Sequence, residues 1–390
     1  MKKAVFAILA VSGIVLAGCS KEEAPELELG SAALNFSGNG GSQTITVDAN
    51  KNWTATNDGA TWYTLDVTSG NGAGTVTVTA EPYGGLEPRT SVVTIKCDGL
   101  IASVEISQNW KKASSGEFLF EEIFFAGNLL SDNSSDSGDG DQFFRITNNS
   151  DKTLYIDGLF IAISDHDSQT SSVGAYYAYP ELKDSISIGT LYQIPGSGND
   201  YPVAPGESKM LALTAQNFKA ENGAGFDLSK ADFEFYDEND YVEDYDNPDV
   251  PNMINWFKSS VSVSTLHNRG YESYALIQIP SSVTQETFLT DYAWKGTKTF
   301  YFKEYVIPSE IQNAWLVPNE WVLDAVNCAV DENLYTLAFN ASVDAGYTNV
   351  STVDKDNARY GKSVLRKKAN GRLVDSNNST NDFEVAQPLL

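Results

Sequence analysis

The feature that most restricts the fold of this chain is a run of short segments, between residues 30 and 109, in which apolar and polar residues alternate. Segments 44–47, 75–79 and 92–95 have the period of two that a half-buried β-strand requires, and clusters of Gly, Asn and Asp separate such segments. About seven strands, with a turn roughly every eight to twelve residues, indicate an immunoglobulin-like sandwich of about eighty residues. No helical periodicity interrupts this region.

The rest of the chain, residues 117–390, also has mostly strand patterns. Residues 142–149, 153–163 and 274–279 are clear strand candidates, and short helices are expected near 251–259, 281–291 and 319–327. Apolar residues make up 42% of the chain and charged residues 20%, which excludes a disordered protein. The expected fold is therefore all-β: an immunoglobulin-like sandwich followed by a larger β-sandwich-type domain with long insertions and a few short helices.

The N-terminus has the pattern of a bacterial export signal. Two lysines precede an apolar run, residues 4–16, which is too short to span a membrane. The following Leu16-Ala17-Gly18-Cys19 resembles a bacterial lipobox, in which small residues admit the signal peptidase and the cysteine thiol carries the lipid. We therefore expect residues 1–18 to be a lipoprotein signal peptide and Cys19 to hold the mature chain in the outer-membrane lipid.

The remaining boundaries follow from composition. Residues 19–29 carry four glutamates and are expected to be an acidic tether, and residues 110–116, rich in Lys and Ser, a linker. Ser20-Lys21-Glu22-Glu23 resembles the export tag of surface lipoproteins in Bacteroidetes-type bacteria, so we expect an outer-membrane protein that faces the cell exterior. A lipid left in the periplasmic leaflet is the alternative. Cys97 and Cys328 lie in different predicted domains and are expected to be buried free thiols.

Charge and histidine content exclude several functions. The chain has 52 acidic and 26 basic residues, and the net charge of −26 opposes a phosphate backbone, which excludes nucleic-acid binding. His166 and His267 are its only histidines, which leaves little room for histidine-based catalysis. His166 follows an apolar strand without a glycine-flanked nucleophile elbow, so we expect a solvated loop histidine. A protein that binds and does not catalyse is the expectation.

Two acidic clusters are candidates for calcium binding. Residues 132–141 combine Asp, Ser and Gly but lack the spacing of an EF-hand loop. Nine acids lie between residues 232 and 249, and among them Asp240, Asp244 and Asp246 are the candidate calcium ligands. Paired carboxylates of a glycosidase would look similar locally. Dense carboxylates are common in so acidic a chain, so solvated loops are the favoured interpretation of both clusters.

Aromatic residues bear on sugar binding, because a flat ring stacks on the apolar face of a pyranose. Trp53 and Trp62 are expected in the core. Three tyrosines within residues 176–179 are hard to bury together, since alternate side chains of a strand point to opposite faces. The candidate ligand-binding residues, all in predicted loops, are Tyr83, Tyr176, Tyr177 and Tyr179.

Basic residues gather near the end of the chain. Seven lie between residues 355 and 372, in contrast with the acidic remainder. They form either a patch for an anionic ligand or partner, or a set of partners for the chain's own carboxylates. We favour the second interpretation for Arg366 and its neighbours.

Several motifs of the first domain are shared with a known family. They are Asn52-Trp53-Thr54-Ala55, Trp62, Ser69-Gly70-Asn71-Gly72, the segment 89–95 and the closing segment 104–108. Together they resemble a BACON domain, the Bacteroidetes-associated carbohydrate-binding often N-terminal domain. The resemblance implies an all-β sandwich with a proposed role in sugar binding; a role as a spacer is the alternative.

A second set of motifs runs in order through the rest of the chain. It includes Asp141-Gln142-Phe143-Phe144, Tyr155-Ile156-Asp157-Gly158-Leu159, Pro205-Gly206-Glu207-Ser208, Asp344-Ala345-Gly346-Tyr347-Thr348 and Gly361-Lys362-Ser363-Val364. These motifs resemble the family catalogued as domain of unknown function 4876, although Arg145 stands where an acidic residue is expected. The resemblance implies a secreted lipoprotein domain without known activity.

These observations define the functional expectation. We expect a surface-anchored accessory binding lipoprotein that captures a glycan or another nutrient beside a TonB-dependent outer-membrane transporter. A structural or assembly component of the cell surface is the alternative, and a hydrolase is the least favoured reading.

Overall fold

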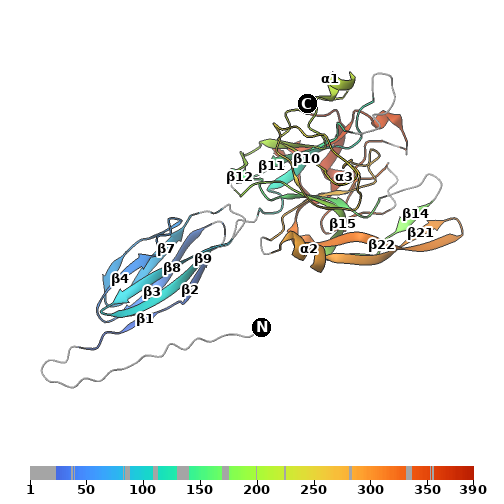
Figure 1. Ribbon diagram of the computed structural model, residues 1–390. Helices are drawn as coiled ribbons and strands as arrows, with labels where there is room; N and C mark the ends of the chain where they lie inside the picture. Colours follow the sequence, from blue (N-terminus) through green and yellow to red (C-terminus); the bar gives the residue numbers. More distant parts are fainter. Residues whose placement is uncertain are drawn as a thin grey trace. The chain divides into compact units, whose positions relative to one another are not determined.

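The structure is a computed structural model that describes residues 23–36, 38, 40–81, 83, 88–108, 113–129, 140–168, 175–198, 200–223, 225–280, 283–330, 336–351, 353 and 355–390. The predicted signal peptide, Cys19 and residues 132–139 of the first acidic cluster lie outside these ranges. The described chain forms two compact units, one built from strands up to Gln108 and one from the residues that follow (Figure 1). None of the described helices is long and apolar enough to cross a membrane.

The first unit consists of two β-sheets. One has the strand order β1-β3-β7-β5 and the other β2-β9-β8-β4-β6. Strands β2 and β9 pair in parallel. The pairs β1 with β3, β3 with β7, β5 with β7, β4 with β6 and β4 with β8 are antiparallel. The strands are β1 Leu27–Leu29, β2 Ala33–Phe36, β3 Gly41–Ala49, β4 Asn52–Asn57, β5 Tyr63–Leu65, β6 Ser69–Asn71, β7 Gly74–Ala80, β8 Arg89–Cys97 and β9 Leu100–Gln108.

The core of this unit follows from the alternation in the sequence. In β7 and β8 every second residue is buried, and the inward valines and isoleucines form one apolar cluster. Trp53 lies in this cluster and its indole N–H donates to the carbonyl of Gly72 at 2.9 Å, while the half-buried Trp62 packs against the cluster. Trp53 is therefore a core residue, as expected, whereas Trp62 lies beside the core and is only partly buried.

One boundary differs from its prediction. Leu27–Leu29, expected in the acidic tether, form β1 and pair with residues 47–49 of β3. The two leucines pack against the core of the sandwich. Burial of this apolar pair outweighs the acidic composition of the segment.

The second unit contains two large sheets. A six-stranded sheet has the order β18-β17-β11-β10-β24-β27, and a larger one the order β14-β21-β22-β15-β13-β20-β23, with β19 also paired to β15. The strands of the first are β10 Phe118–Phe124, β11 Phe143–Asn148, β17 Ser208–Ala212, β18 Phe233–Glu234, β24 Ser363–Arg366 and β27 Phe383–Ala386. Those of the second are β13 Phe160–Ser164, β14 Tyr176–Ala178, β15 Ser185–Gln193, β19 Ile254–Lys258, β20 Tyr274–Ile277, β21 Ala293–Phe302, β22 Tyr305–Pro318 and β23 Val322–Val326.

Apolar residues cover both faces of each large sheet. The largest cluster takes side chains from both sheets, among them Phe120, Phe144, Ile161 and Tyr274. A second cluster lies on the other face of the larger sheet and includes Phe288 of helix α2, and a third lies on the other face of the six-stranded sheet. Every residue of β10 and of β13 is therefore buried, including Glu121 and Glu122 of β10.

The helical predictions for this unit are partly confirmed. Helix α2, Gln285–Asp291, lies within the expected 281–291 and begins after Thr284, whose hydroxyl accepts from the backbone N–H of Thr287. The helix predicted near 251–259 is wrong, because residues 254–258 form β19 on the edge of β15. The third prediction is also wrong: a short 3-10 turn, Asn319–Trp321, leads directly into β23. In both segments, pairing with the larger sheet favoured a strand over the predicted helix.

Shorter elements complete the unit. They are the strand pairs β12 Leu154–Tyr155 with β16 Pro202–Val203 and β25 Lys368–Ala369 with β26 Arg372–Leu373, the helices α1 Phe218–Asn222 and α3 Ser379–Asp382, and the 3-10 turn Asn357–Arg359.

A long hairpin extends from the larger sheet. Strands β21 and β22 pair over most of their length, and β14 adds a third strand on the outer edge of β21 (Figure 1). We call this three-stranded extension the arm. At its tip Tyr305, Val306 and Ile307 are 56%, 58% and 52% exposed. Apolar side chains this exposed on adjacent residues mark a surface that is available for contact.

Candidate functional site

Two of the four tyrosines predicted to bind ligand, Tyr176 and Tyr177, lie on the arm. Tyr176 and Tyr177 form β14 and not a loop, because they pair with Tyr301 and Phe300 of β21. Their side chains alternate between the two faces of the sheet, so both rings are half-buried. The structure therefore confirms the argument that these tyrosines are not buried together.

Each face of the arm carries one aromatic row. On one face the ring of Tyr176 stacks on that of Tyr301, with centroids 4.9 Å apart and planes 13° apart, and Val306 continues the row. On the other face Tyr177 packs on Phe300 at 5.1 Å, and Ile307 continues the row. Two half-exposed apolar rows on a hairpin can stack against flat apolar faces of a ligand.

Tyr179 has a different position from the other two tyrosines. Its ring stacks on the imidazole of His166, with centroids 4.0 Å apart and planes 26° apart. The ammonium of Lys298 lies 5.5 Å from the same ring and 4.8 Å from the ring of Tyr177. The Tyr179 hydroxyl accepts a hydrogen bond from the backbone N–H of Asp167 at 3.2 Å. Tyr179 therefore joins the arm to the turn after β13 and offers little open ring surface.

The turn after β13 places three titratable residues next to the arm. His166, expected on a solvated loop, is only 3% exposed, because Tyr179 and the residues near Ala338 cover it. Burial, with a further effect of the Lys298 charge, lowers the pKa of His166 to about 3. Burial raises the pKa of Asp165 to about 6 and also raises that of Asp167, although Lys298 opposes both shifts. At neutral pH the imidazole is therefore uncharged.

A cavity of about 330 Å³ opens beside this turn. Its wall includes the imidazole of His166, the ring of Tyr179, apolar side chains and the polar side chains of Ser185, Thr336 and Asn340. Two buried polar atoms of the turn, Asp165 Oδ2 and His166 Nε2, have no hydrogen-bond partner in the described part of the chain. Sequence reasoning missed this site, because nothing local in Asp165-His166-Asp167 indicates burial.

A larger cavity of about 430 Å³ lies elsewhere in the unit, lined by residues that include Ser115, Asn319 and Asp324. The polar side chains there are already paired: Asp324 binds Arg366, and Asn319 binds Asn340 and Ser342. We therefore regard the smaller cavity as the stronger candidate site, since Nε2 of His166 in its wall has no hydrogen-bond partner among the described residues.

The last predicted tyrosine, Tyr83, lies outside the arm. The guanidinium of Arg89 lies 4.0 Å from the centroid of the Tyr83 ring, and the backbone N–H of Tyr83 donates to the carbonyl of Gly38. A guanidinium already occupies one face of this ring, so the structure does not favour Tyr83 as a platform for a sugar.

The three predicted calcium ligands do not converge. Among the described residues, which include all three, no group of three or more His, Cys, Asp or Glu side chains could hold a metal ion. Asp244 accepts from the backbone N–H groups of Asp237 and Tyr245, and Asp246 accepts from the side chain of Asn252. The prediction of a cation cage at Asp240, Asp244 and Asp246 is corrected accordingly, because backbone and amide donors already engage two of these carboxylates.

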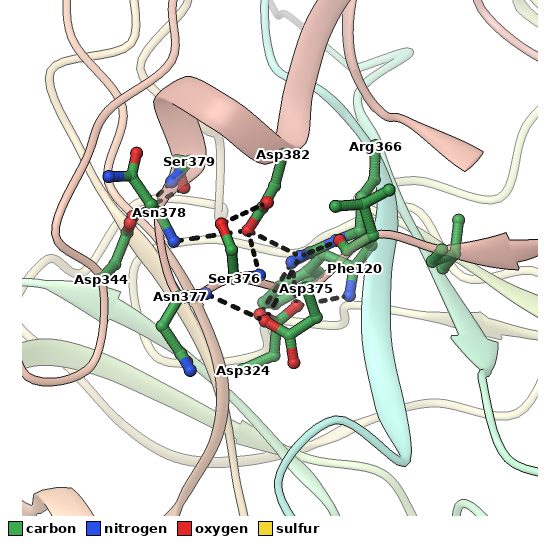
Figure 2. Close-up of polar contacts among 12 residues, drawn as sticks. Phe120, Asp324, Asp344, Arg366, Asp375, Ser376, Asn377, Asn378, Ser379 and Asp382 are labelled. Atoms are coloured by element: carbon green, nitrogen blue, oxygen red, sulfur yellow. Dashed lines mark hydrogen bonds and ion pairs between the residues drawn. The ribbon is translucent and has the colours of Figure 1, made fainter. Parts of the chain in front are cut away.

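The basic residues near the C-terminus mostly contact the chain itself. Arg366 is buried and donates to both carboxylate oxygens of Asp324, as Figure 2 shows. The ammonium of Lys368 lies 2.6 Å from the carboxylate of Glu121, and Arg359 donates to the carbonyl of Asn268. The favoured interpretation of Arg366 and its neighbours is therefore confirmed.

Part of the predicted linker also belongs to the second unit. The backbone N–H of Ala113 donates to the side chain of Gln278, and the hydroxyl of Ser115 donates to the carbonyl of Leu323. The predicted linker 110–116 is therefore too long at its C-terminal end. Both remaining cysteines, Cys97 and Cys328, are buried free thiols, as expected.

Comparison with known proteins finds a matching family for part of each of the two units. Residues 51–109 match the model of the BACON family, described as "Putative binding domain, N-terminal", and residues 204–389 match that of DUF4876, a protein family of unknown function. No curated protein matches the chain.

Solved structures give similar results. The crystal structure of a DUF4876 family protein from Bacteroides thetaiotaomicron superposes with a TM-score of 0.54 at 19% identity, over 92% of this chain and 96% of that one. A Bacteroides ovatus GH5 xyloglucanase in complex with a XXXG heptasaccharide aligns at 22% identity, with a TM-score of 0.22, over 28% of this chain and 24% of that one. The fold is thus shared with the first of these structures. This chain carries an N-terminal BACON domain followed by a DUF4876 domain.

Proposed function

We propose that this protein is a lipid-anchored binding protein of the outer cell surface, which captures a glycan beside a TonB-dependent transporter. The observation that carries the proposal is the pair of half-exposed aromatic rows on the two faces of the arm, at Tyr176 with Tyr301 and at Tyr177 with Phe300. The match to a family of binding domains in the first unit supports a binding role.

The chemistry of the arm fits a sugar ligand. Aromatic rings stack on the apolar C–H faces of sugar rings, and carboxylates and ammonium groups bind hydroxyls. Both kinds of group occur here, because the ammonium of Lys298 lies 4.8 Å from the Tyr177 ring and Asp165 and Asp167 lie in the turn next to the arm. By analogy with base stacking, one ring contributes roughly 1–3 kcal/mol. A single ring would give a dissociation constant in the millimolar range or weaker, so useful affinity needs several rings along the arm.

We further propose that the protein binds without catalysing a reaction. With a pKa of about 3, the imidazole of His166 is a weak base, far from the near-neutral value that favours general acid–base catalysis. The second histidine, His267, stacks on Tyr271 at 4.1 Å. These features favour binding over hydrolysis.

The tip of the arm favours a second candidate role, that of a structural or assembly component. Tyr305, Val306 and Ile307 expose apolar surface that a neighbouring protein could cover. In the capture proposal the same tip is available for contact with the transporter. The two roles differ in whether the arm binds a soluble ligand.

A glycan-binding experiment tests the proposal. The full chain with Cys19→Ala is screened on a glycan array, and the ligands found are titrated by calorimetry. The double variant Tyr176→Ala/Tyr177→Ala should weaken binding by about tenfold or more, since two platforms are removed. Tyr155→Ala, an exposed tyrosine of β12, is the matched control and should bind as the parent does. Absence of any glycan ligand, or equal affinity of the double variant and the control, would contradict capture along the arm.

A further inference from the structure

Unpartnered polar atoms concentrate at one place in the second unit. In the described part of the chain five buried side-chain polar atoms have no hydrogen-bond partner, and three of them are Asp165 Oδ2, His166 Nε2 and Ser187 Oγ. The first two belong to consecutive residues. The third belongs to the strand alongside, since the backbone N–H of Asp165 donates to the carbonyl of Ser187 at 3.3 Å.

The grouping of three unpartnered buried polar atoms in one place needs a physical explanation. Buried polar groups in proteins almost always have a partner, and an exception points to strain, function or an occupant that completes the bonds. His166 is 97% buried, being 3% exposed, and it lines the cavity of about 330 Å³ described above. This volume is at the lower end of the range of small-molecule sites. One unpartnered buried nitrogen, Nε2 of His166, therefore lies in the wall of a cavity that has room for a small ligand.

The charged groups near the cavity determine whether it can bind an anion, a cation or a neutral ligand. An anion is disfavoured by the carboxylates of Asp165, Asp167 and Glu181 near the wall. A metal cation is disfavoured because Lys298 lies close by and no group of three potential ligands is present among the described residues. A neutral molecule remains.

The same groups select the chemistry of a neutral occupant. A neutral imidazole offers one donor and one acceptor nitrogen, a carboxylate accepts, and a serine hydroxyl does both. A ligand hydroxyl also donates and accepts, so it can complete the bonds of any of these groups. The wall also contains apolar side chains, among them Leu182 and Phe339, which suit the C–H face of a sugar ring.

We propose that the cavity lined by His166 and Tyr179 is a subsite for one neutral sugar unit, with a hydroxyl of that sugar bonded to Nε2 of His166. The proposal rests on the proposed function and deepens it, because the subsite lies where Tyr179 meets the aromatic row of Tyr177. His166 is the direct contact; Asp165 and Ser187 do not line the cavity and lie next to His166, in the same turn and in the adjacent strand.

The two histidines of the chain allow a direct test. Imidazole ¹⁵N spectra of the full Cys19→Ala chain contain two sets of side-chain signals, one from His166 and one from His267. The probes are free D-glucose, D-galactose, D-mannose, D-xylose, L-arabinose and N-acetyl-D-glucosamine. At least one of these sugars should shift the His166 resonances in a saturable manner and leave those of His267 unchanged. If no sugar of the panel shifts His166, the proposal is overturned.

Matched variants separate this proposal from capture along the arm. His166→Phe keeps a ring against Tyr179 and removes both nitrogens, and His267→Phe makes the same change in the other histidine stack, against Tyr271. His166→Phe should weaken the sugar that shifts His166 by about tenfold or more, and His267→Phe should leave its affinity unchanged.

Stability provides a second readout. His166→Phe removes an unpartnered buried nitrogen and also the imidazole's hydrogen bond with the backbone of Ala338, so the variant should fold with a stability close to the parent's. If array glycans depend on Tyr176 and Tyr177 but bind His166→Phe as they bind the parent, the subsite is wrong and capture along the arm stands. If no glycan binds the parent chain, both proposals are wrong.

Discussion

The side chains of Arg366 and Asp324 form a buried two-bond pair across the second unit. Nη2 of Arg366 donates to Oδ1 and Oδ2 of Asp324 at 2.7 and 2.6 Å, and both residues are buried (Figure 2). Asp324 lies in β23 of the larger sheet and Arg366 in β24 of the six-stranded sheet. The pair therefore ties the two sheets together at one edge of the main core.

The same pair supports an irregularity in β10. The register of β10 against β11 shifts between Phe120 and Glu122. The backbone N–H of Phe120 donates to Oδ2 of Asp324, and its carbonyl accepts from Nε of Arg366. The side-chain pair thus satisfies backbone groups that the strand ladder leaves unpaired at this point.

Removal of the arginine should be strongly destabilising. Arg366→Met leaves the Asp324 carboxylate buried without its cation, which should lower the free energy of unfolding by about 3–5 kcal/mol. Urea unfolding at neutral pH measures the loss. Arg372→Met, a change of an exposed arginine, is the control and should have a small effect. The double variant Arg366→Met/Asp324→Leu should recover part of the stability; a double variant less stable than the single one would refute this account.

Asp165→Asn should stabilise the protein at neutral pH. Burial raises the pKa of Asp165 from 3.8 to about 6, so the native state favours the protonated carboxyl. The stability that Asp165 contributes is then complete below pH 3.8 and is lost as the pH rises through about 6. The asparagine variant should be about 1–2 kcal/mol more stable than the parent near pH 7, with solvent screening taken into account.

Unfolding measured across acidic and neutral pH checks this expectation. The difference between the variant and the parent should shrink as the pH falls through the pKa of Asp165. Asp184→Asn, at an exposed aspartate, is the control and should show no such trend. A difference that is independent of pH would mean that Asp165 has an ordinary pKa.

Gly70→Ala should destabilise the first unit. A Cβ atom at Gly70 would lie 2.3 Å from Cζ2 and 2.6 Å from Cε2 of the buried Trp53 ring. The indole is held by its hydrogen bond to Gly72, so the change should lower stability by about 1–3 kcal/mol, as overpacking usually does. Calorimetric unfolding of the full chain measures it, with the exposed neighbour Ser69→Ala as the control. Equal transition temperatures for the two variants would show that Trp53 moves aside freely.

Cys19→Ala should release the protein from the membrane. The lipobox preceding Cys19 predicts that its thiol carries the lipid, and the anchoring of a lipid-modified chain depends on that residue. Cell fractionation followed by a carbonate wash tests this expectation, with Cys97→Ala as a control that keeps the predicted anchor. A Cys19→Ala protein that stayed in the washed outer-membrane fraction would rule out the lipid as its attachment.

Local patterns predicted those parts of the structure that depend on local causes. Alternation along β7 and β8 predicts which side chains are inside, because a strand sends successive residues to opposite faces. The same rule predicted that the tyrosines at 176–179 would not be buried together. Motifs of Trp53 and Gly70 and those of the second domain were sufficient to recognise both families.

Contacts between distant segments determined the rest. Residues 254–258 form a strand because they pair with β15, and Leu27–Leu29 form a strand because they pair with β3. His166 is buried because Tyr179, the residue after β14, stacks on it. None of these partners can be read from the neighbouring residues, since pairing and burial depend on which surfaces the folded chain brings together. The candidate site itself has this origin: its residues come from a turn, an arm and a distant loop that meet only after the sheets have formed.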